Sequence, residues 1–155
     1  MSARFKMGKV EPNAYRALDA LDSYNAAGSV DAIHQEMIRI RASQINGCAY
    51  CVNMHTQDAR KAGETEQRIN LIAVWKEATN VFTEEEQLIL KLTEEITLIH
   101  QHGLTESTYQ RALSFFGKEK LAQLMMVIIA INAWNRIGVA LKMEPELQAS
   151  LEIQK

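Results

Sequence analysis

Four residues within one short segment combine thiol chemistry with the means to move protons. Cys48 and Cys51 form a C-x-x-C pair, a spacing that lets the two sulfurs meet in an intramolecular disulfide. Gly47 precedes the pair and marks a break, so we expect the pair to open a helix. Unpaired backbone N–H groups and the positive end of the helix dipole favour the thiolate there, and the thiolate is the reactive form of cysteine.

Two further residues could transfer protons to and from these thiols. His55 lies four residues after Cys51, so on a helix both side chains share a face and the imidazole can accept the thiol proton. Glu36 lies 12 residues before Cys48, on a preceding helix. If these two helices pack antiparallel, the Glu36 carboxylate returns to the same place and can orient the histidine or stabilise its charged form.

Two plainer interpretations compete with thiol catalysis. A free cysteine is often only a small buried apolar residue, although a pair with these neighbours is seldom so. Cys48, Cys51, His55 and Glu36 could instead supply four ligands to a zinc ion. Structural zinc sites more often use a second cysteine pair or two histidines, which this chain lacks at a suitable spacing. We therefore expect neither a metal nor another cofactor.

The spacing of apolar residues, prolines and glycines predicts an all-α fold. Proline occurs only at positions 12 and 145, which favours long helices between them. Apolar stripes predict seven helices, some of them capped by Ser29, Thr65, Thr83 and Thr105. Their approximate ranges are 12–26, 29–46, 48–62, 65–75, 83–102, 105–117 and 118–142. We expect a single-domain multi-helix bundle over residues 1–155.

The composition fits a folded protein without a membrane span or a basic surface. Lys and Arg number 17 and Asp and Glu 19, a formal charge of −2, whereas nucleic-acid-binding proteins usually have a strongly basic patch. The longest apolar run, Leu124 to Ile131, has eight residues. A membrane helix needs about 20. No apolar segment of a secretory signal follows the first basic residues, so we expect a cytoplasmic protein that binds neither nucleic acid nor membrane.

The spacing Glu-x11-Cys-x2-Cys-x3-His, formed by Glu36, Cys48, Cys51 and His55, resembles the alkyl hydroperoxidase D core of the carboxymuconolactone decarboxylase family. The flanking segments 46–51 and 59–63 resemble that core too. The predicted helices between about residues 15 and 141 agree with the all-α fold of the family. A bare C-x-x-C is a weak signal, but the upstream glutamate and downstream histidine make this pattern fairly specific.

The resemblance implies a thiol-dependent peroxidase with an antioxidant role. Cys51 would attack the peroxide O–O bond and become a sulfenic acid, and Cys48 would then form a disulfide with it. His55 and Glu36 would relay protons. A dithiol reductant of the dihydrolipoamide or thioredoxin kind would reset the pair. The resemblance also implies a homo-oligomer, either a trimer or a hexamer.

Tyr50 departs from the pattern of the best-known family members, which carry a histidine immediately before the second cysteine. A tyrosine is a poor base at neutral pH, so we expect a shorter proton relay and weaker peroxidase activity. The residues alone leave the order of attack open. The start of a helix favours Cys48, whereas the histidine one turn away favours Cys51. We predict Cys51.

Two other functions compete with a peroxidase. The same fold family includes lyases that decarboxylate a carboxylated lactone, although these do not rely on a C-x-x-C pair. A non-catalytic role, as a redox-sensing oligomeric helical module, would fit the long apolar final helix.

Four large side chains outside the candidate site carry expectations of their own. We predict that Trp75 and Trp134 anchor the core, with either able to border a substrate pocket. We predict that Arg39 and Arg41 are solvated. Their alternative role is to bind an anionic substrate, for which the sequence gives no further sign.

Overall fold

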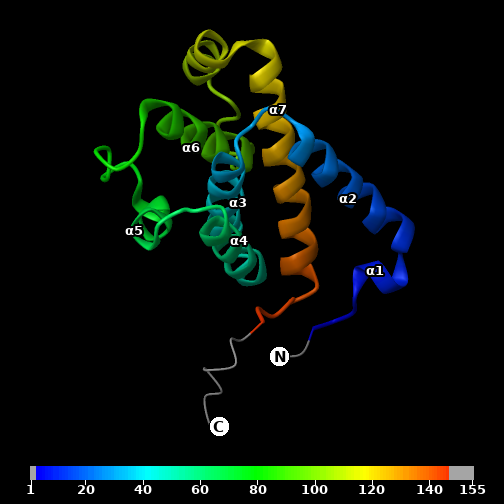
Figure 1. Cartoon of the computed structure of the whole chain (residues 1–155). Helices are drawn as coiled ribbons and strands as arrows, with labels where there is room; N and C mark the ends of the chain where they lie inside the picture. Colours follow the sequence, from blue (N-terminus) through cyan, green and yellow to red (C-terminus); the bar gives the residue numbers. More distant parts are fainter. Residues whose placement is uncertain (1–2, 147–155) are drawn as a thin grey trace.

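The computed structural model describes residues 3–146, which fold into helices with no strand among them. Figure 1 shows these helices arranged around one long helix, α7. The predicted all-α fold is confirmed. The elements are α1 (Met7–Val10), α2 (Pro12–Ala27), α3 (Ala32–Asn46), α4 (Ala49–Lys61), α5 (Glu66–Leu71), the 3-10 helix η1 (Ile72–Val74), α6 (Glu84–Thr97) and α7 (Glu106–Ala140).

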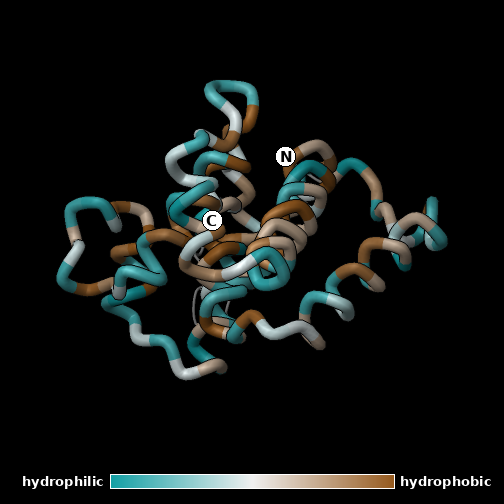
Figure 2. Tube along the Cα trace, turned by 90° about the horizontal axis from the view of Figure 1, so that it is seen from above, coloured by the Kyte–Doolittle hydropathy of each residue, from teal (hydrophilic) through white to brown (hydrophobic). Residues whose placement is uncertain are grey.

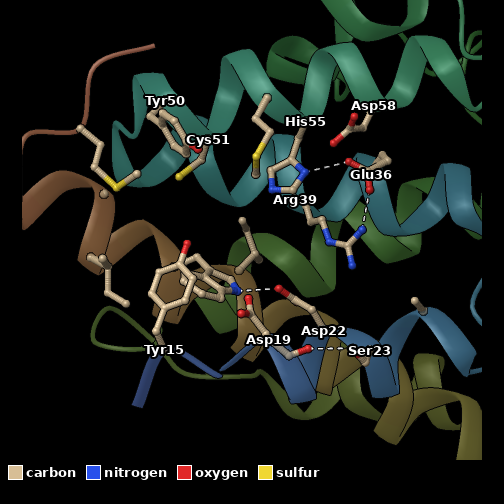
Figure 3. Close-up of a pocket in the computed structure, with 17 residues that line it drawn as sticks. Tyr15, Asp19, Asp22, Ser23, Glu36, Arg39, Tyr50, Cys51, His55 and Asp58 are labelled. Atoms are coloured by element: carbon tan, nitrogen blue, oxygen red, sulfur yellow. Dashed lines mark hydrogen bonds and ion pairs between the residues drawn. The ribbon is translucent and has the colours of Figure 1, made fainter. Parts of the chain in front are cut away.

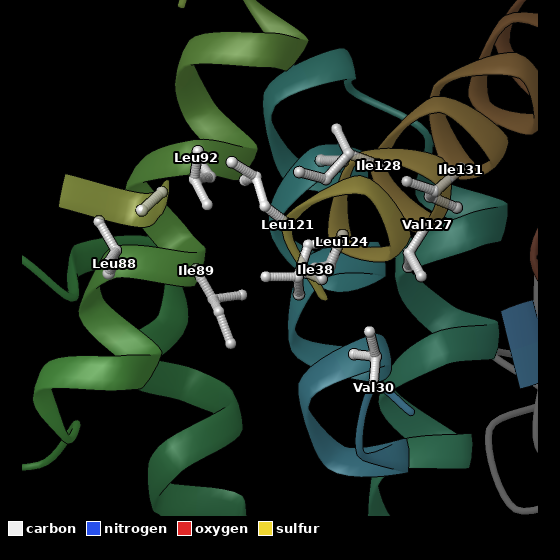
Figure 4. Packing of buried hydrophobic residues seen from close by; sticks show 12 residues of the cluster. Val30, Ile38, Leu88, Ile89, Leu92, Leu121, Leu124, Val127, Ile128 and Ile131 are labelled. Carbon is white, nitrogen blue, oxygen red and sulfur yellow. The ribbon is translucent and has the colours of Figure 1, made fainter. Parts of the chain in front are cut away.

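The main hydrophobic core lies where α3, α6 and α7 meet. Ile38 of α3, Leu92 of α6 and Ile128 of α7 are fully withdrawn from solvent. Figure 4 shows side chains from these helices directed into the same space. Burial of one such aliphatic side chain contributes about 1.5–3 kcal/mol, so this cluster holds the three helices together. The apolar run 124–131 enters the core from within a helix, as predicted.

A second core cluster covers the opposite side of α3. Met37 and Ile40 of α3 pack there with Ile72 of η1 and with Trp75. The prediction that Trp75 anchors the core is confirmed, since its side chain is buried in this cluster. Because both sides of α3 are packed, the position of this helix is fixed, and so is the position of any side chain it directs toward α4.

Glu94 gathers the polar groups that the second cluster buries. Arg41 donates to its Oε1 over 2.6 and 2.9 Å, Trp75 donates over 2.8 Å, and Lys76 lies 2.7 Å from Oε2. Burial raises the pKa of Glu94, but the hydrogen bonds from Lys76, Trp75 and Arg41 outweigh it and hold the pKa below its usual value. The prediction that Arg41 is solvated is wrong, because Glu94 on α6 holds its guanidinium against the core.

α7 is one long helix with a break in its first half. At Gly117 the backbone turns to φ 72° and ψ 168°, a conformation that glycine adopts without steric cost. The break lies where we predicted the boundary between helices 105–117 and 118–142. By length and composition alone α7 could cross a bilayer, a test that a core helix also passes. Its apolar residues here pack against α3 and α6.

α2 lies against α7 on the side away from α6. The rings of Tyr15 on α2 and Trp134 on α7 meet edge to face with centroids 4.8 Å apart. The Trp134 indole N–H donates to Asp22 over 2.6 Å. Seen from above, α1 and α2 form an arm at the margin of the molecule (Figure 2). Within α2 only Asn25 is buried, so this helix covers α7 without entering the core.

Several helix boundaries differ from the predictions. Ser29 does not cap a helix, because its N–H and hydroxyl both donate to Gln123. α3 begins two residues later, where the Asp31 carboxylate accepts from the N–H of Ile33. The predicted helix 83–102 ends at Thr97, since the following residues form turns. The predicted helix 65–75 becomes α5 followed by the 3-10 helix η1.

The other caps are confirmed. Thr65, Thr83 and Thr105 each accept a hydrogen bond from the backbone N–H three residues later. At Thr83 the cap is reciprocal, because Glu86 also accepts from the backbone N–H of Thr83. These caps fix the start of α5, α6 and α7, the helices that frame α3 and α4.

Candidate active site

The cysteine pair opens α4, as the sequence predicts. Gly47 ends α3 with φ 69°, a left-handed conformation that lets the chain reverse within one residue. Cys48 is the N-cap of α4, and its Sγ accepts from the N–H of Cys51 over 3.3 Å. The two sulfurs are joined in a disulfide, with the Cα atoms 5.3 Å apart. The structure therefore describes the oxidised state of the pair.

A glycine of α7 lies directly on the disulfide. A Cβ at Gly138 would lie 2.7 Å from the Cys48 Sγ and 3.4 Å from the Cys51 Sγ. The first distance is shorter than real Cβ contacts, so α7 can lie this close to the sulfurs only because position 138 has no side chain. Sequence reasoning missed this residue. Its signal was a glycine inside a predicted helix, away from either cap.

The two cysteines differ in what they face. Both are almost completely buried, Cys48 at 2% and Cys51 at 3% exposure. Cys51 lines a pocket of about 480 Å³, and Cys48 does not belong to the lining. Figure 3 shows the Cys51 sulfur directed into this cavity from α4. A small molecule in the pocket would thus meet Cys51 first.

Glu36 and His55 meet beside the pocket. The Nδ1 atom of His55 and the Oε2 atom of Glu36 lie 2.8 Å apart, within hydrogen-bond distance. α3 and α4 are joined by the tight turn at Gly47 and pack closely along their length, which returns Glu36 to the level of His55. Both residues line the cavity that Cys51 lines. The structure therefore brings three of the four predicted site residues, Glu36, Cys51 and His55, to one cavity. The fourth, Cys48, is bonded to Cys51.

Arg39 completes the environment of Glu36. Its guanidinium pairs with Oε1 of Glu36 and donates to the side-chain oxygen of Gln35 over 3.0 Å. The prediction that Arg39 is solvated is wrong, because Glu36, one turn earlier on α3, lies within reach of its guanidinium. Each carboxylate oxygen of Glu36 thus has its own partner, His55 on one and Arg39 on the other. This arrangement fixes the orientation of the carboxylate and, through it, of the imidazole.

The opposite wall of the pocket comes from α2 and α7. Tyr15, Asp19 and Asp22 face the cavity from α2 (Figure 3). Trp134 of α7 also lines it. Trp134 therefore borders the pocket, one of the two roles predicted for it. Burial raises the pKa of Tyr15, and the carboxylates of Asp19 and Asp22 and the Tyr50 phenol add to the increase. Tyr15 is therefore an uncharged hydrogen-bond donor at neutral pH.

The sequence held a signal for the α2 wall that was not used. Tyr15, Asp19 and Asp22 follow one another at spacings of four and three residues, so they share one face of a helix. An aromatic residue and two carboxylates on one helix face are compatible with a polar wall of a ligand pocket. Polar residues on an exposed helix face carry a weaker periodic signal than residues that face a core, so this pattern does not by itself predict a pocket wall.

Tyr50 lines the pocket next to Cys51. It occupies the position at which the family resemblance leads one to expect histidine, so the base nearest to the Cys51 sulfur along the chain is replaced by a phenol. His55 is the imidazole that the described residues place at this cavity. Proton transfer at Cys51 would therefore depend on His55 and its partner Glu36.

The four residues considered as zinc ligands from the sequence do not form a ligand set in this structure. The sulfurs of Cys48 and Cys51 are bonded to each other and are not thiolate ligands in this state. Ligand atoms of Glu36, His55 and Asp58 lie within 4.8 Å of one another. Arg39 already brings a positive charge to Glu36, so a cation there would meet repulsion and competition. The arrangement fits a proton relay better than a metal centre.

Comparison with known proteins places this site in a family. The model of the carboxymuconolactone decarboxylase family matches residues 12–95, more than half of the chain, including both cysteines, Glu36 and His55. The uncharacterised protein YdfG of Bacillus subtilis is 38% identical over 141 residues, covering 91% of this chain and 95% of that protein.

Solved structures show the same fold. A protein of unknown function from Agrobacterium tumefaciens, provisionally described as the antioxidant defence protein AhpD, superposes with a TM-score of 0.91 at 34% identity. That match covers 95% of this chain and all of the other. A peroxidase-related protein from Silicibacter has a TM-score of 0.74 at 20% identity, over 84% of this chain and 69% of that one, a likeness of fold alone. By sequence and by structure, the chain belongs to the carboxymuconolactone decarboxylase family.

Proposed function

We propose that the protein is a thiol-dependent peroxidase that reduces hydroperoxides with the Cys48–Cys51 pair. The observation that carries the proposal is the difference between the two sulfurs. Cys51 lines the pocket beside the Glu36–His55 pair, whereas Cys48 lies behind it at the start of α4. Attack from Cys51 followed by closure with Cys48 leads to the disulfide that the structure describes. The likeness to an AhpD-type antioxidant protein supports the same chemistry.

The reaction begins with the reduced pair. His55 accepts the proton of the Cys51 thiol, and the thiolate attacks one peroxide oxygen. A sulfur–oxygen bond forms, the O–O bond breaks, and the leaving alkoxide takes a proton from His55 and departs as an alcohol. Cys51 is now a sulfenic acid. The Cys48 sulfur attacks the Cys51 sulfur, the disulfide forms, and water leaves. Two thiols and one hydroperoxide thus give one disulfide, one alcohol and one water.

Glu36 sets the direction of proton transfer. With the His55 Nδ1 atom bonded to Glu36, the Nε2 atom is the one left to exchange protons with the pocket. The carboxylate also stabilises the imidazolium that forms when His55 takes the thiol proton. Glu36 is a positioning residue in this scheme, and His55 is the acid and base.

The cycle needs an external dithiol. A reductant of the dihydrolipoamide or thioredoxin kind would attack the disulfide, form a mixed disulfide and release both thiols. Such reductants work in a reducing compartment, so we place the protein in the cytoplasm. We also propose a homo-oligomer, a trimer or a hexamer, as the family resemblance implies, with no nucleic acid or membrane partner.

Trapping of the sulfenic acid tests the order of attack. In Cys48→Ser the sulfenate at Cys51 has no partner, so a 1,3-dione probe should label Cys51 after addition of cumene hydroperoxide. In Cys51→Ser the remaining thiol at Cys48 should stay unlabelled, because it does not line the pocket. Equal labelling of both variants would show that the pocket does not decide which sulfur reacts. Lactone decarboxylation that survives loss of both cysteines would favour the lyase instead.

A further inference from the structure

We propose that the Cys51 pocket selects its substrates by charge, taking hydroperoxides whose organic group is cationic or uncharged and rejecting those that carry a carboxylate. This inference rests on the proposed peroxidase function, and it adds the substrate class. It follows from the α2 wall, which faces Cys51 across the cavity (Figure 3).

The α2 wall carries two carboxylates, and the ion pairs among the described residues involve neither of them. Asp19 and Asp22 both line the pocket. Asp22 accepts a hydrogen bond from the uncharged indole N–H of Trp134, and neither carboxylate forms an ion pair with a residue that the structure describes. Two formal negative charges therefore face the space that a substrate would occupy.

The side of the pocket formed by α3 and α4 does not offset the charges of Asp19 and Asp22. Arg39 is the guanidinium in the lining, and it is already paired with Glu36. Asp58, a further carboxylate of the lining, pairs with Lys61 at the exposed rim. The lining thus holds four carboxylates, those of residues 19, 22, 36 and 58, against one guanidinium, together with the imidazole of His55. Among the described residues that line the cavity, the one guanidinium already has a carboxylate partner, so an entering anion would compete with Glu36 for it.

The aromatic residues reinforce this preference. Tyr15 and Trp134 form a packed edge-to-face pair beside the two aspartates, and Tyr50 lines the same cavity. The faces of aromatic rings carry negative potential and attract cations. The side chains of Ile131, Ile137 and others add apolar surface, so the pocket accepts a hydrophobic body. A hydrophobic body with a neutral or cationic group fits this combination, and a carboxylate does not.

The size of the effect follows from Coulomb's law. At an effective dielectric constant near 60 and a separation near 8 Å, a unit charge and one carboxylate interact enough to change affinity by about threefold. Two carboxylates should therefore separate a cationic from a neutral ligand, and a neutral from an anionic one, by about tenfold each. Added salt should reduce both of these differences in affinity.

Binding of unreactive alcohols tests the proposal without any turnover. The probes are 2-phenyl-2-propanol, which is the product of cumene hydroperoxide, and its para-carboxylate and para-trimethylammonium derivatives. Each is titrated into the oxidised wild-type protein by calorimetry, with quenching of Trp134 fluorescence as a second readout. We expect the cationic probe to bind most tightly and the carboxylate most weakly, in steps of about tenfold.

Asp19→Asn should shrink each step by about threefold, because it removes one of the two charges and keeps the shape. Glu119→Gln is the matched control, since Glu119 is an exposed carboxylate on α7 outside the pocket lining, and it should leave the order unchanged. Equal affinity for the three probes, tighter binding of the carboxylate, or no binding of any probe would overturn the proposal.

Charge selection by the pocket and peroxidase activity can fail independently, and the experiments distinguish the two failures. A charge order in probe binding, with no consumption of cumene hydroperoxide by the reduced protein, would remove the peroxidase and keep the charge-selective pocket. Turnover of cumene hydroperoxide and of its para-carboxylate at equal efficiency would keep the peroxidase and remove the charge selection.

Discussion

Glu36 and His55, which are 19 positions apart and lie on neighbouring helices, are within hydrogen-bond distance at 2.8 Å. The pair lines the same cavity as Cys51. A buried carboxylate bonded to an imidazole beside a cysteine is the arrangement that activates a thiol and then returns the proton to a leaving group. The contact therefore ties the local geometry of α3 and α4 to the proposed chemistry.

Replacing Glu36 tests this contact. Glu36→Gln keeps the size of the side chain but removes the charge that stabilises the imidazolium. We expect the rate of Cys51 oxidation by cumene hydroperoxide to fall by about 10² fold at neutral pH, measured by stopped-flow fluorescence. Glu77→Gln, at an exposed position outside the pocket lining, is the control. A rate equal to that of wild type would exclude Glu36 from the relay.

Gly138→Ala tests the packing of α7 on the disulfide. Alanine favours a helix over glycine by about 1 kcal/mol, but its Cβ would lie 2.7 Å from the Cys48 Sγ. We expect the clash to dominate and the free energy of unfolding of the oxidised protein to fall by about 1–3 kcal/mol in denaturant titrations.

Two comparisons separate the clash from a general effect of the mutation. In a Cys48→Ala background the same substitution should lower the free energy of unfolding by less, because the sulfur nearest to the added methyl group is absent. Gly8→Ala adds a Cβ at an ordinary 3.4 Å from the Tyr15 ring and should cost little. Equal losses in both backgrounds would mean that the sulfur is not what the added methyl group meets.

Glu94 gives a prediction for pH. Its pKa is lowered in the folded state, so its contribution to stability is present above the pKa of the unfolded state and is lost as pH falls through the folded value. We expect Glu94→Gln to be less stable than wild type at pH 7, by about 1–3 kcal/mol, since Arg41 and Lys76 lose their anionic partner.

The same variant should lose less stability than wild type between about pH 5 and pH 3, because one titrating group is absent. Chemical unfolding at pH 7 and pH 3.5 measures both differences. Glu86 and Glu95, whose pKa values are also lowered, keep part of the acid response in the variant. If the difference in the free energy of unfolding between the variant and wild type were as large at pH 3.5 as at pH 7, Glu94 would not be the charged, hydrogen-bonded group described here.

Tyr50 offers a test of the departure from the best-known members of the family. Tyr50→His would place a second imidazole beside Cys51, and we expect the oxidation rate at neutral pH to rise by about tenfold through an added base. Tyr50→Phe removes the hydroxyl alone and should change the rate little. A Tyr50→His variant that is no faster than wild type would show that His55 and Glu36 already supply all the proton transfer the reaction can use.

The sequence was informative where local rules decide the structure. The break at Gly47 and the capping pattern at Thr83 depend on a few neighbouring residues, and both were predicted correctly. The helix boundary near Ser29 was wrong because Gln123, 94 positions away, accepts hydrogen bonds from both the N–H and the hydroxyl of Ser29. Local propensity cannot anticipate a competing partner of that kind.

The candidate site divides in the same way. The set of Glu36, Cys48, Cys51 and His55 lies within one hairpin of helices, so its spacing predicted its assembly. Arg39 was missed although its partner Glu36 lies three residues earlier on the same helix, a spacing that places both side chains on one face. The α2 wall was missed because its role depends on how α2 packs against α7, which spacing within α2 does not encode. Gly138 was missed for a related reason, since its partner is the disulfide at the start of another helix.

The central claim is that the pair is a peroxide-reactive dithiol with Cys51 as the attacking residue. Its most direct test is to count free thiols in the reduced protein before and after one equivalent of cumene hydroperoxide, on wild type and on Cys51→Ser. The proposed function predicts that wild type loses both thiols per chain and that the variant keeps its remaining one. Survival of both thiols in wild type, or equal loss of the Cys48 thiol in the variant, would contradict it.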